Sequence, residues 1–249
     1  MNTLDYNEIN RKLTDLYKEH LCKYTKTELE NAFGTNDYSN PLLIHCWEDY
    51  TKDYVRIMYI GRETSSWYSD DFCEDVNGYY DISKLIDLVK VKFDFKFEKK
   101  YKFFSLLYKI EYALNHVQNE LGKSPKIHNF LWTNVFKFGR HDARKGRPLK
   151  NVRDWERQHF NILRDEIRIT QPDLVIFVTG KGKNHDQDFL NPVLGDIRII
   201  SIENQTDIVE INCDGIDIPM YRIPRPENYK HNKIIDTLTK HFKQHYNSD

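Results

Sequence analysis

One continuous apolar run limits what this chain can fold into more than any other feature. Residues 173–179 are Asp-Leu-Val-Ile-Phe-Val-Thr, and Gly180-Lys181-Gly182 follow at once. A run of this kind that stops at glycine is typical of a parallel strand buried on both faces. We therefore expect it to form a central strand of an α/β fold.

Shorter apolar runs alternate with helical patterns along the rest of the chain. We expect further strands at residues 55–60, 127–136, 197–202, 208–211 and 218–223, and helices at 4–33, 81–89, 103–121, 152–169 and 230–245. The strands at 197–202 and 208–211 are candidates for an antiparallel pair. Strands that alternate with helices predict a mostly parallel central sheet between two helix layers, which is a three-layer α/β/α domain.

Residues 89–97 carry a different pattern. Val89, Val91, Phe93, Phe95 and Phe97 alternate with charged side chains. A period of two predicts a half-buried strand. The charged face of this strand would be solvated or, alternatively, would contact DNA.

Length and charge set the expected organisation. The 249 residues fit one domain over 1–249, with residues 1–45 as a helical extension at the N-terminus. A net charge of −1 is not the basic signature of a non-specific nucleic-acid binder, so any DNA contact must come from local patches. We find no secretory leader and no apolar run of transmembrane length, and expect a cytoplasmic monomer without membrane contact.

The cysteine and histidine patterns predict no metal and no cofactor. Cys22, Cys46, Cys73 and Cys213 are widely scattered and form no C-x-x-C pair. This spacing argues against a disulfide framework, structural zinc and an iron–sulfur cluster. The histidines form no H-E-x-x-H motif. We expect four reduced thiols.

Polar residues follow several predicted strands, where ligands of open α/β sheets bind. Gly61 would let the backbone turn sharply after the strand at 55–60, and Glu63 would place a carboxylate at the mouth of the sheet. Alternatively, Glu63 lies in the first turn of a helix, where the helix dipole favours an acidic residue. The other polar strand ends are Thr133-Asn134, Thr179–Gly182 and Pro224-Arg225-Pro226.

A basic stretch follows the Asn134 strand. It is marked as a loop by Gly139, Gly146 and Pro148, and contains Arg140, Arg144, Lys145, Arg147, Lys150 and Arg153. We favour phosphate contact for this stretch, and a solvated loop is the alternative. Gly180-Lys181-Gly182-Lys183 does not have the spacing of a nucleotide-binding P-loop.

The residues at these strand ends resemble the motifs of the uracil-DNA glycosylase superfamily. Gly61-Arg62-Glu63 is similar to the first motif of the family, G-Q-D-P-Y or G-E-A-P-G, with Thr64 in place of proline. Residues 130–134 resemble the strand whose last asparagine reads a flipped base, and residues 173–180 resemble the next core strand. Residues 221–229 resemble the final motif, with Arg225-Pro226 in place of His-Pro. The resemblance covers residues 50–245 and implies the glycosylase fold.

The resemblance also implies a role for each strand end. Glu63 would orient or deprotonate water and stabilise a cationic sugar, while Arg225 would support the leaving base or a phosphate. Asn134 would bind the edge of the base. Further substrate contacts are expected from Gly61, Arg62, Thr64, Trp67, Tyr68, Phe72, Asn228 and Tyr229. DNA-backbone contacts are expected from Arg140, Arg144, Lys145, Arg147 and Lys181.

The departures from the family motifs affect the expected substrate. Arg225 and Glu63 favour a base other than plain uracil, such as a modified pyrimidine of phage DNA, which would make the protein an antiviral defence enzyme. Uracil repair remains an alternative. Two other classes stay open: a nucleic-acid-binding module without catalysis, and a hydrolase of free nucleosides.

Overall fold

The computed structural model describes most of the chain. The described residues are 4–64, 73–98, 102–120, 122–142, 147–180, 183–202, 207–226 and 231–246. The predicted site residues outside these ranges are Trp67, Tyr68, Phe72, Arg144, Lys145, Lys181, Asn228 and Tyr229.

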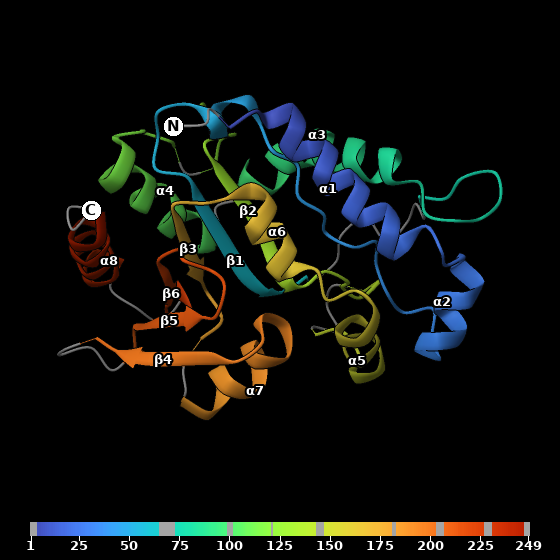
Figure 1. The fold of residues 1–249 in the computed structure, drawn as a ribbon. Coiled ribbons are helices and arrows are strands. Elements are labelled where there is room, and N and C mark those ends of the chain that lie inside the picture. Colours follow the sequence, from blue (N-terminus) through green and yellow to red (C-terminus); the bar gives the residue numbers. More distant parts are fainter. Residues whose placement is uncertain are drawn as a thin grey trace.

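A six-stranded sheet in the order β2-β1-β3-β6-β5-β4 forms the centre of the fold (Figure 1). Four neighbouring strands are parallel: β2 (Phe130–Phe136), β1 (Ile57–Glu63), β3 (Leu174–Phe177) and β6 (Met220–Arg222). The antiparallel strands β5 (Val209–Cys213) and β4 (Ile197–Ser201) complete one edge. The predicted mostly parallel sheet and the antiparallel pair are both confirmed.

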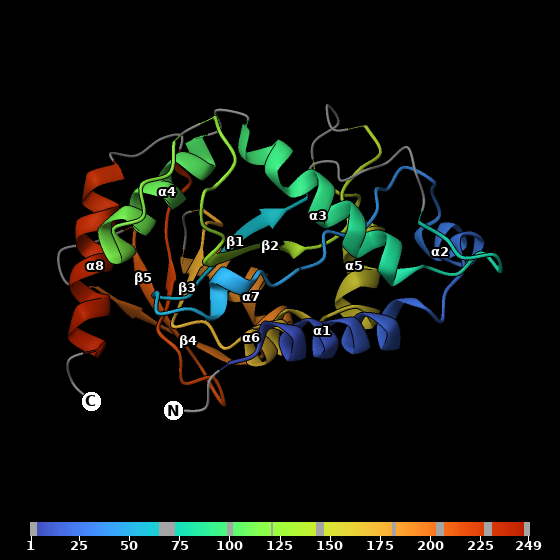
Figure 2. The same cartoon turned by 90° about the horizontal axis from the view of Figure 1, so that it is seen from above.

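Helices cover both faces of the sheet (Figure 2). One layer contains α3 (Ile82–Glu98), α4 (Lys102–Asn115) and α8 (His231–Tyr246), and the other contains α1 (Tyr6–Leu21), α5 (Lys150–His159), α6 (Leu163–Thr170) and α7 (Lys183–Leu194). The short helix α2 (Lys26–Phe33) packs against α5, and a 3-10 turn occupies Glu48–Thr51. The three-layer α/β/α class is therefore confirmed. Within the described ranges, no helix combines the length and apolarity needed to cross a membrane.

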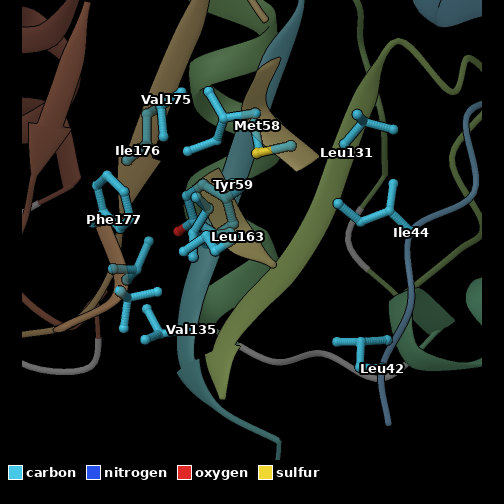
Figure 3. Packing of buried hydrophobic residues seen from close by; sticks show 14 of the residues in the cluster. Leu42, Ile44, Met58, Tyr59, Leu131, Val135, Leu163, Val175, Ile176 and Phe177 are labelled. Atoms are coloured by element: carbon cyan, nitrogen blue, oxygen red, sulfur yellow. The ribbon is translucent and has the colours of Figure 1, made fainter. Parts of the chain in front are cut away.

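The core lies on both faces of β1 and β3. All of β3 and the first five residues of β1 are buried, as a continuous apolar strand requires. Figure 3 shows Met58, Tyr59 and Ile176 at its centre, with Ile44 from the N-terminal segment alongside. Residues of α1, such as Leu13, join the same core, as do Leu42 and Ile44 of the segment before β1. All four cysteines are free thiols, and Cys46, Cys73 and Cys213 are buried.

The predicted strand at 89–97 is wrong, because α3 runs through it to Glu98. Alternating apolar residues include pairs four apart, which a helix also places on one face. Val89 and Phe93 form such a pair and are buried, whereas Val91 between them is 72% exposed. The burial therefore follows the helical period and not the strand period.

Some predicted helix boundaries are also wrong. The helix expected over 4–33 is two helices, because Thr25 begins α2 with a capping box to Glu28. The helix expected over 152–169 is likewise split into α5 and α6, with buried Phe160 and Ile162 between them. The helix expected over 103–121 stops at Asn115, whose side chain binds both backbone polar groups of Val55. Helix α7 was not predicted.

Glu111 of α4 is a buried carboxyl that makes stability depend on pH. Burial raises its pKa to about 8, and a hydrogen bond with Asn115 acts in the opposite direction. Asn129, in its hydrogen-bonding orientation, donates to both Glu111 oxygens at 2.7 and 3.2 Å. The unfolded glutamate titrates near 4.5, so folding binds a proton between these two pKa values.

The Glu111→Gln variant is expected to lose this pH dependence. Stability of the wild-type protein should decline as pH rises from 4.5 to about 8, since ionising the buried carboxyl opposes folding. The stability of the variant relative to wild type should therefore increase across this range. Urea unfolding near pH 4.5 and above pH 8 measures the difference, and an equal difference at both values would contradict the assignment.

Candidate active site

The carboxyl ends of the parallel strands bring the predicted site segments together. Gly61 of β1 pairs in register with Asn134 of β2, and Ile60 pairs with Phe177 at the end of β3. Phe177 in turn pairs with Arg222, three residues before Arg225. Segments from four distant parts of the sequence thus meet at one edge of the sheet.

Gly61 does not end β1, which corrects the predicted turn at this residue. The strand continues to Glu63, which pairs with Phe136. Glycine is required here for a different reason, because a Cβ atom on Gly61 would overlap Oδ1 of Asn134. The close approach of the Asn134 side chain, and not a bend of the backbone, therefore explains why this position holds glycine.

Asn134 and Thr64 form a buried hydrogen-bonded pair beside Gly61. Asn134 Nδ2 donates to Thr64 Oγ1 at 2.9 Å, and Thr64 Oγ1 donates to the carbonyl oxygen of Phe136 at 3.1 Å. Both side chains are buried. The pair links the end of β1 to the end of β2, and the expected contact of Asn134 with a base stays a prediction.

Replacing Gly61 with alanine is expected to destabilise the protein by about 1–3 kcal/mol, the usual cost of overfilling a packed site. The added methyl group must push Asn134 away and break its bond to Thr64. Urea unfolding measures the change. The Gly61→Ala/Asn134→Ala variant is the control, because it removes the overlapping amide. If alanine at 61 is equally costly in both backgrounds, Asn134 does not cause the strain.

Glu63 lies among three arginines from different segments. Its Oε2 is 3.2 Å from Nε of the neighbouring Arg62. Its Oε1 is 3.1 Å from Nε of Arg147 and 3.8 Å from Nη2 of Arg225. The structure therefore brings together four of the predicted site residues, from β1, the basic loop and the segment after β6.

Arg62 is the inner arginine of this cluster. Its side chain is 13% exposed, and its guanidinium lies over the ring of Phe189 in α7, 4.9 Å from the centroid. Burial lowers the pKa of Arg62 most, and the charges of Arg147, Arg225 and Arg153 lower it further, against the opposing effect of Glu63. These four arginines and the Glu63 carboxylate make the described part of the site strongly positive.

Helix α5 adds two arginines beside the end of β2. The guanidinium carbons of Arg153 and Arg157 lie 5.8 and 5.2 Å from the ring centroid of Phe136. The two residues are four apart, so a helix presents them on the same side. Within the described residues, several polar atoms here are buried and form no hydrogen bond: Nε of Arg153 and Arg157, and the ion-paired Nε of Arg62 and Oε2 of Glu63. Donors of this kind can bind an anion.

Two residues of this site, Arg157 and Phe189, are not among those predicted from the sequence. Arg157 could have been found from its position one helical turn after Arg153. Phe189 had no such signal, because α7 was not predicted and its contact with Arg62 depends on the packing of distant segments.

Arg140 forms an ion pair away from Glu63, unlike Arg147 of the same basic stretch. Its Nε donates to Asp37 Oδ2 at 3.0 Å, and its Nη2 donates to the same oxygen. Asp37 belongs to the segment after α2, so this ion pair ties the loop to the N-terminal part of the chain. Arg147, in contrast, reaches Glu63.

Comparison with known proteins does not place the chain in a family. No family model matches it, and no curated protein matches it. Among the described residues, no three histidine, cysteine, aspartate or glutamate side chains are grouped so that they could hold a metal ion. The functional features of the described site are therefore Glu63 and the arginines around it.

Proposed function

We propose that the chain is a DNA glycosylase that hydrolyses the N-glycosidic bond of a flipped base. The observation that carries this proposal is the Glu63 carboxylate at the carboxyl edge of a parallel sheet, within 4 Å of three guanidinium groups. Such an edge is where α/β folds bind ligands. The excess positive charge suits a substrate with phosphate groups on both sides of the reacting nucleotide.

The chemistry of base release matches these groups. Breaking the bond builds positive charge on the sugar and negative charge on the departing base, and water must reach the anomeric carbon. Glu63 would stabilise the sugar cation and orient the water. Arg225 would support the departing base or an adjacent phosphate, because its guanidinium is a permanent cation with several donors. Asn134 would contact the base edge once its bond to Thr64 opens.

The proposed substrate is a modified pyrimidine in DNA. Its removal would give the protein a role in defence against phage. Arg225 occupies the position of the histidine in the family motif, and an arginine presents more donors than an imidazole. A modified base with additional acceptor groups could accept hydrogen bonds from the extra donors of Arg225. Uracil is the alternative substrate at the same site.

The direct test is a search for released bases. The protein is incubated with normal, uracil-containing and phage-modified DNA, and free bases are identified by mass spectrometry. We expect one base to be released from one of the modified DNAs and no release by the Glu63→Gln variant. Absence of any released base from DNA that the protein binds would contradict the glycosylase proposal.

A binding module without catalysis is the second candidate. The observation that favours it is that both oxygens of Glu63 lie near arginines, so that the carboxylate acts as a counter-ion. This function predicts that Glu63→Gln changes DNA affinity while neither protein releases a base.

A further inference from the structure

The arginines around Glu63 fall into an inner and an outer group. Arg62 is 13% exposed and is stacked on Phe189, so its contact with Oε2 is held in place. Arg147 and Arg225 are 52% and 47% exposed, and both approach the other oxygen, Oε1. Glu63 itself is 15% exposed, but the arginine partner of each outer ion pair is about half exposed and keeps much of its contact with water. Ion pairs with a solvated partner contribute little to stability, so the outer two arginines can be displaced by another anion at small cost.

The two outer guanidiniums are close enough to bind one phosphate together. Their nitrogens lie 3.1 and 3.8 Å from the same oxygen atom. Each guanidinium can offer two parallel N–H donors to phosphate oxygens. A Cβ atom added to Gly180 would lie 3.9 Å from Cγ of Arg225, so the aliphatic part of the Arg225 side chain lies beside the segment that follows β3.

We propose that a backbone phosphate of the substrate DNA binds between Arg147 and Arg225 and displaces their ion pairs with Glu63. The same contact that anchors the substrate then frees Oε1 for its reaction, while Arg62 keeps Oε2 in position. This inference rests on the proposed function for the role of the freed carboxylate, but the phosphate site itself does not depend on base release.

Competition between Glu63 and phosphate for the same two arginines is directly measurable. Binding of inorganic phosphate and of a short oligonucleotide with unmodified bases is measured by calorimetry on the full chain. Glu63→Gln should raise the affinity for both by about two- to fivefold, the factor that corresponds to the energy of an exposed ion pair. Arg147→Gln and Arg225→Gln should each lower it. The gain from Glu63→Gln should vanish when both outer arginines are glutamine.

The pair Arg168 and Asp165 on α6 provides matched controls. Its atoms are 3.6 Å apart, and both side chains are about half exposed. Arg168 lies near Gly215, beyond the end of β5 that points away from the carboxyl ends of the parallel strands. Arg168→Gln and Asp165→Asn change the net charge by the same amounts as the test variants and should leave affinity unchanged. An equal gain from Asp165→Asn, or no gain from Glu63→Gln, would overturn the competition.

The outcomes separate this proposal from the glycosylase proposal. If the variants behave as expected but no DNA releases a base, the phosphate site stands and the enzymatic function fails. If a base is released but phosphate affinity is insensitive to Glu63, the function stands and the displacement fails. If Glu63→Gln changed the affinity for inorganic phosphate but not that for the oligonucleotide, the assignment of the site to a DNA phosphate would be overturned.

Discussion

Replacing Glu63 with glutamine is expected to slow base release by about a hundredfold or more, the range for loss of a positioned acid–base group. Glutamine has nearly the same shape but carries no negative charge, so it can neither stabilise a cationic sugar nor accept a proton from water. The measurement is the single-turnover rate of base release with protein in excess over DNA.

The binding data distinguish this effect from a loss of substrate affinity. If phosphate displaces Glu63 from Arg147 and Arg225, the variant binds DNA more tightly while it reacts more slowly. Asp165→Asn removes one negative charge from an ion pair on α6 and should leave the rate unchanged. A Glu63→Gln variant with the wild-type rate would show that another group carries the chemistry.

Replacing Lys137 with methionine is expected to destabilise the protein by about 3–5 kcal/mol, as when one partner of a buried ion pair is removed. Lys137 Nζ donates to Glu166 Oε2 at 2.5 Å and also to Thr133, and both charged side chains are almost completely buried. Tyr17 OH donates to the other oxygen of Glu166 at 3.0 Å. Without Lys137, the Glu166 carboxylate would be buried without its counter-ion. Urea unfolding measures the loss.

The double variant Lys137→Met/Glu166→Gln is the control for this mechanism. It removes both charges, so much of the stability lost in the single variant should return. Equal destabilisation in both variants would mean that packing of the lysine stem, and not its charge, is what matters. Lys137 follows β2 directly, so the ion pair also holds the start of the basic loop that carries Arg147.

The strands of the sheet could be predicted because burial on both faces leaves a simple sequence pattern. Residues 174–178 have no polar side chain, and β3 lies among them in the centre of the sheet. The pattern failed at residues 89–97, where Val89 and Phe93 fit both a strand and a helix. Local periodicity cannot separate the two there, since only the surrounding core decides which side chains are buried.

The candidate site was predicted in part for a related reason. Glu63, Arg225 and the basic loop stood out because charged residues directly after apolar runs lie at the carboxyl edge of a parallel sheet. The predicted role of Gly61 as a sharp backbone turn was wrong, because nothing in the local sequence shows that the Asn134 side chain lies against it. Phe189 was missed because its contact with Arg62 joins residues more than a hundred positions apart.

The sequence by itself determined the α/β class, the strands β1 and β3, and the presence of a carboxylate and arginines at strand ends. These features depend on the order of apolar and polar residues along short segments. Only the tertiary structure decided that Arg62, Arg147 and Arg225 share one carboxylate, with Arg62 held inside and the other two exposed. The register between distant strands and the packing of helices set those contacts, and neither is encoded in any local pattern.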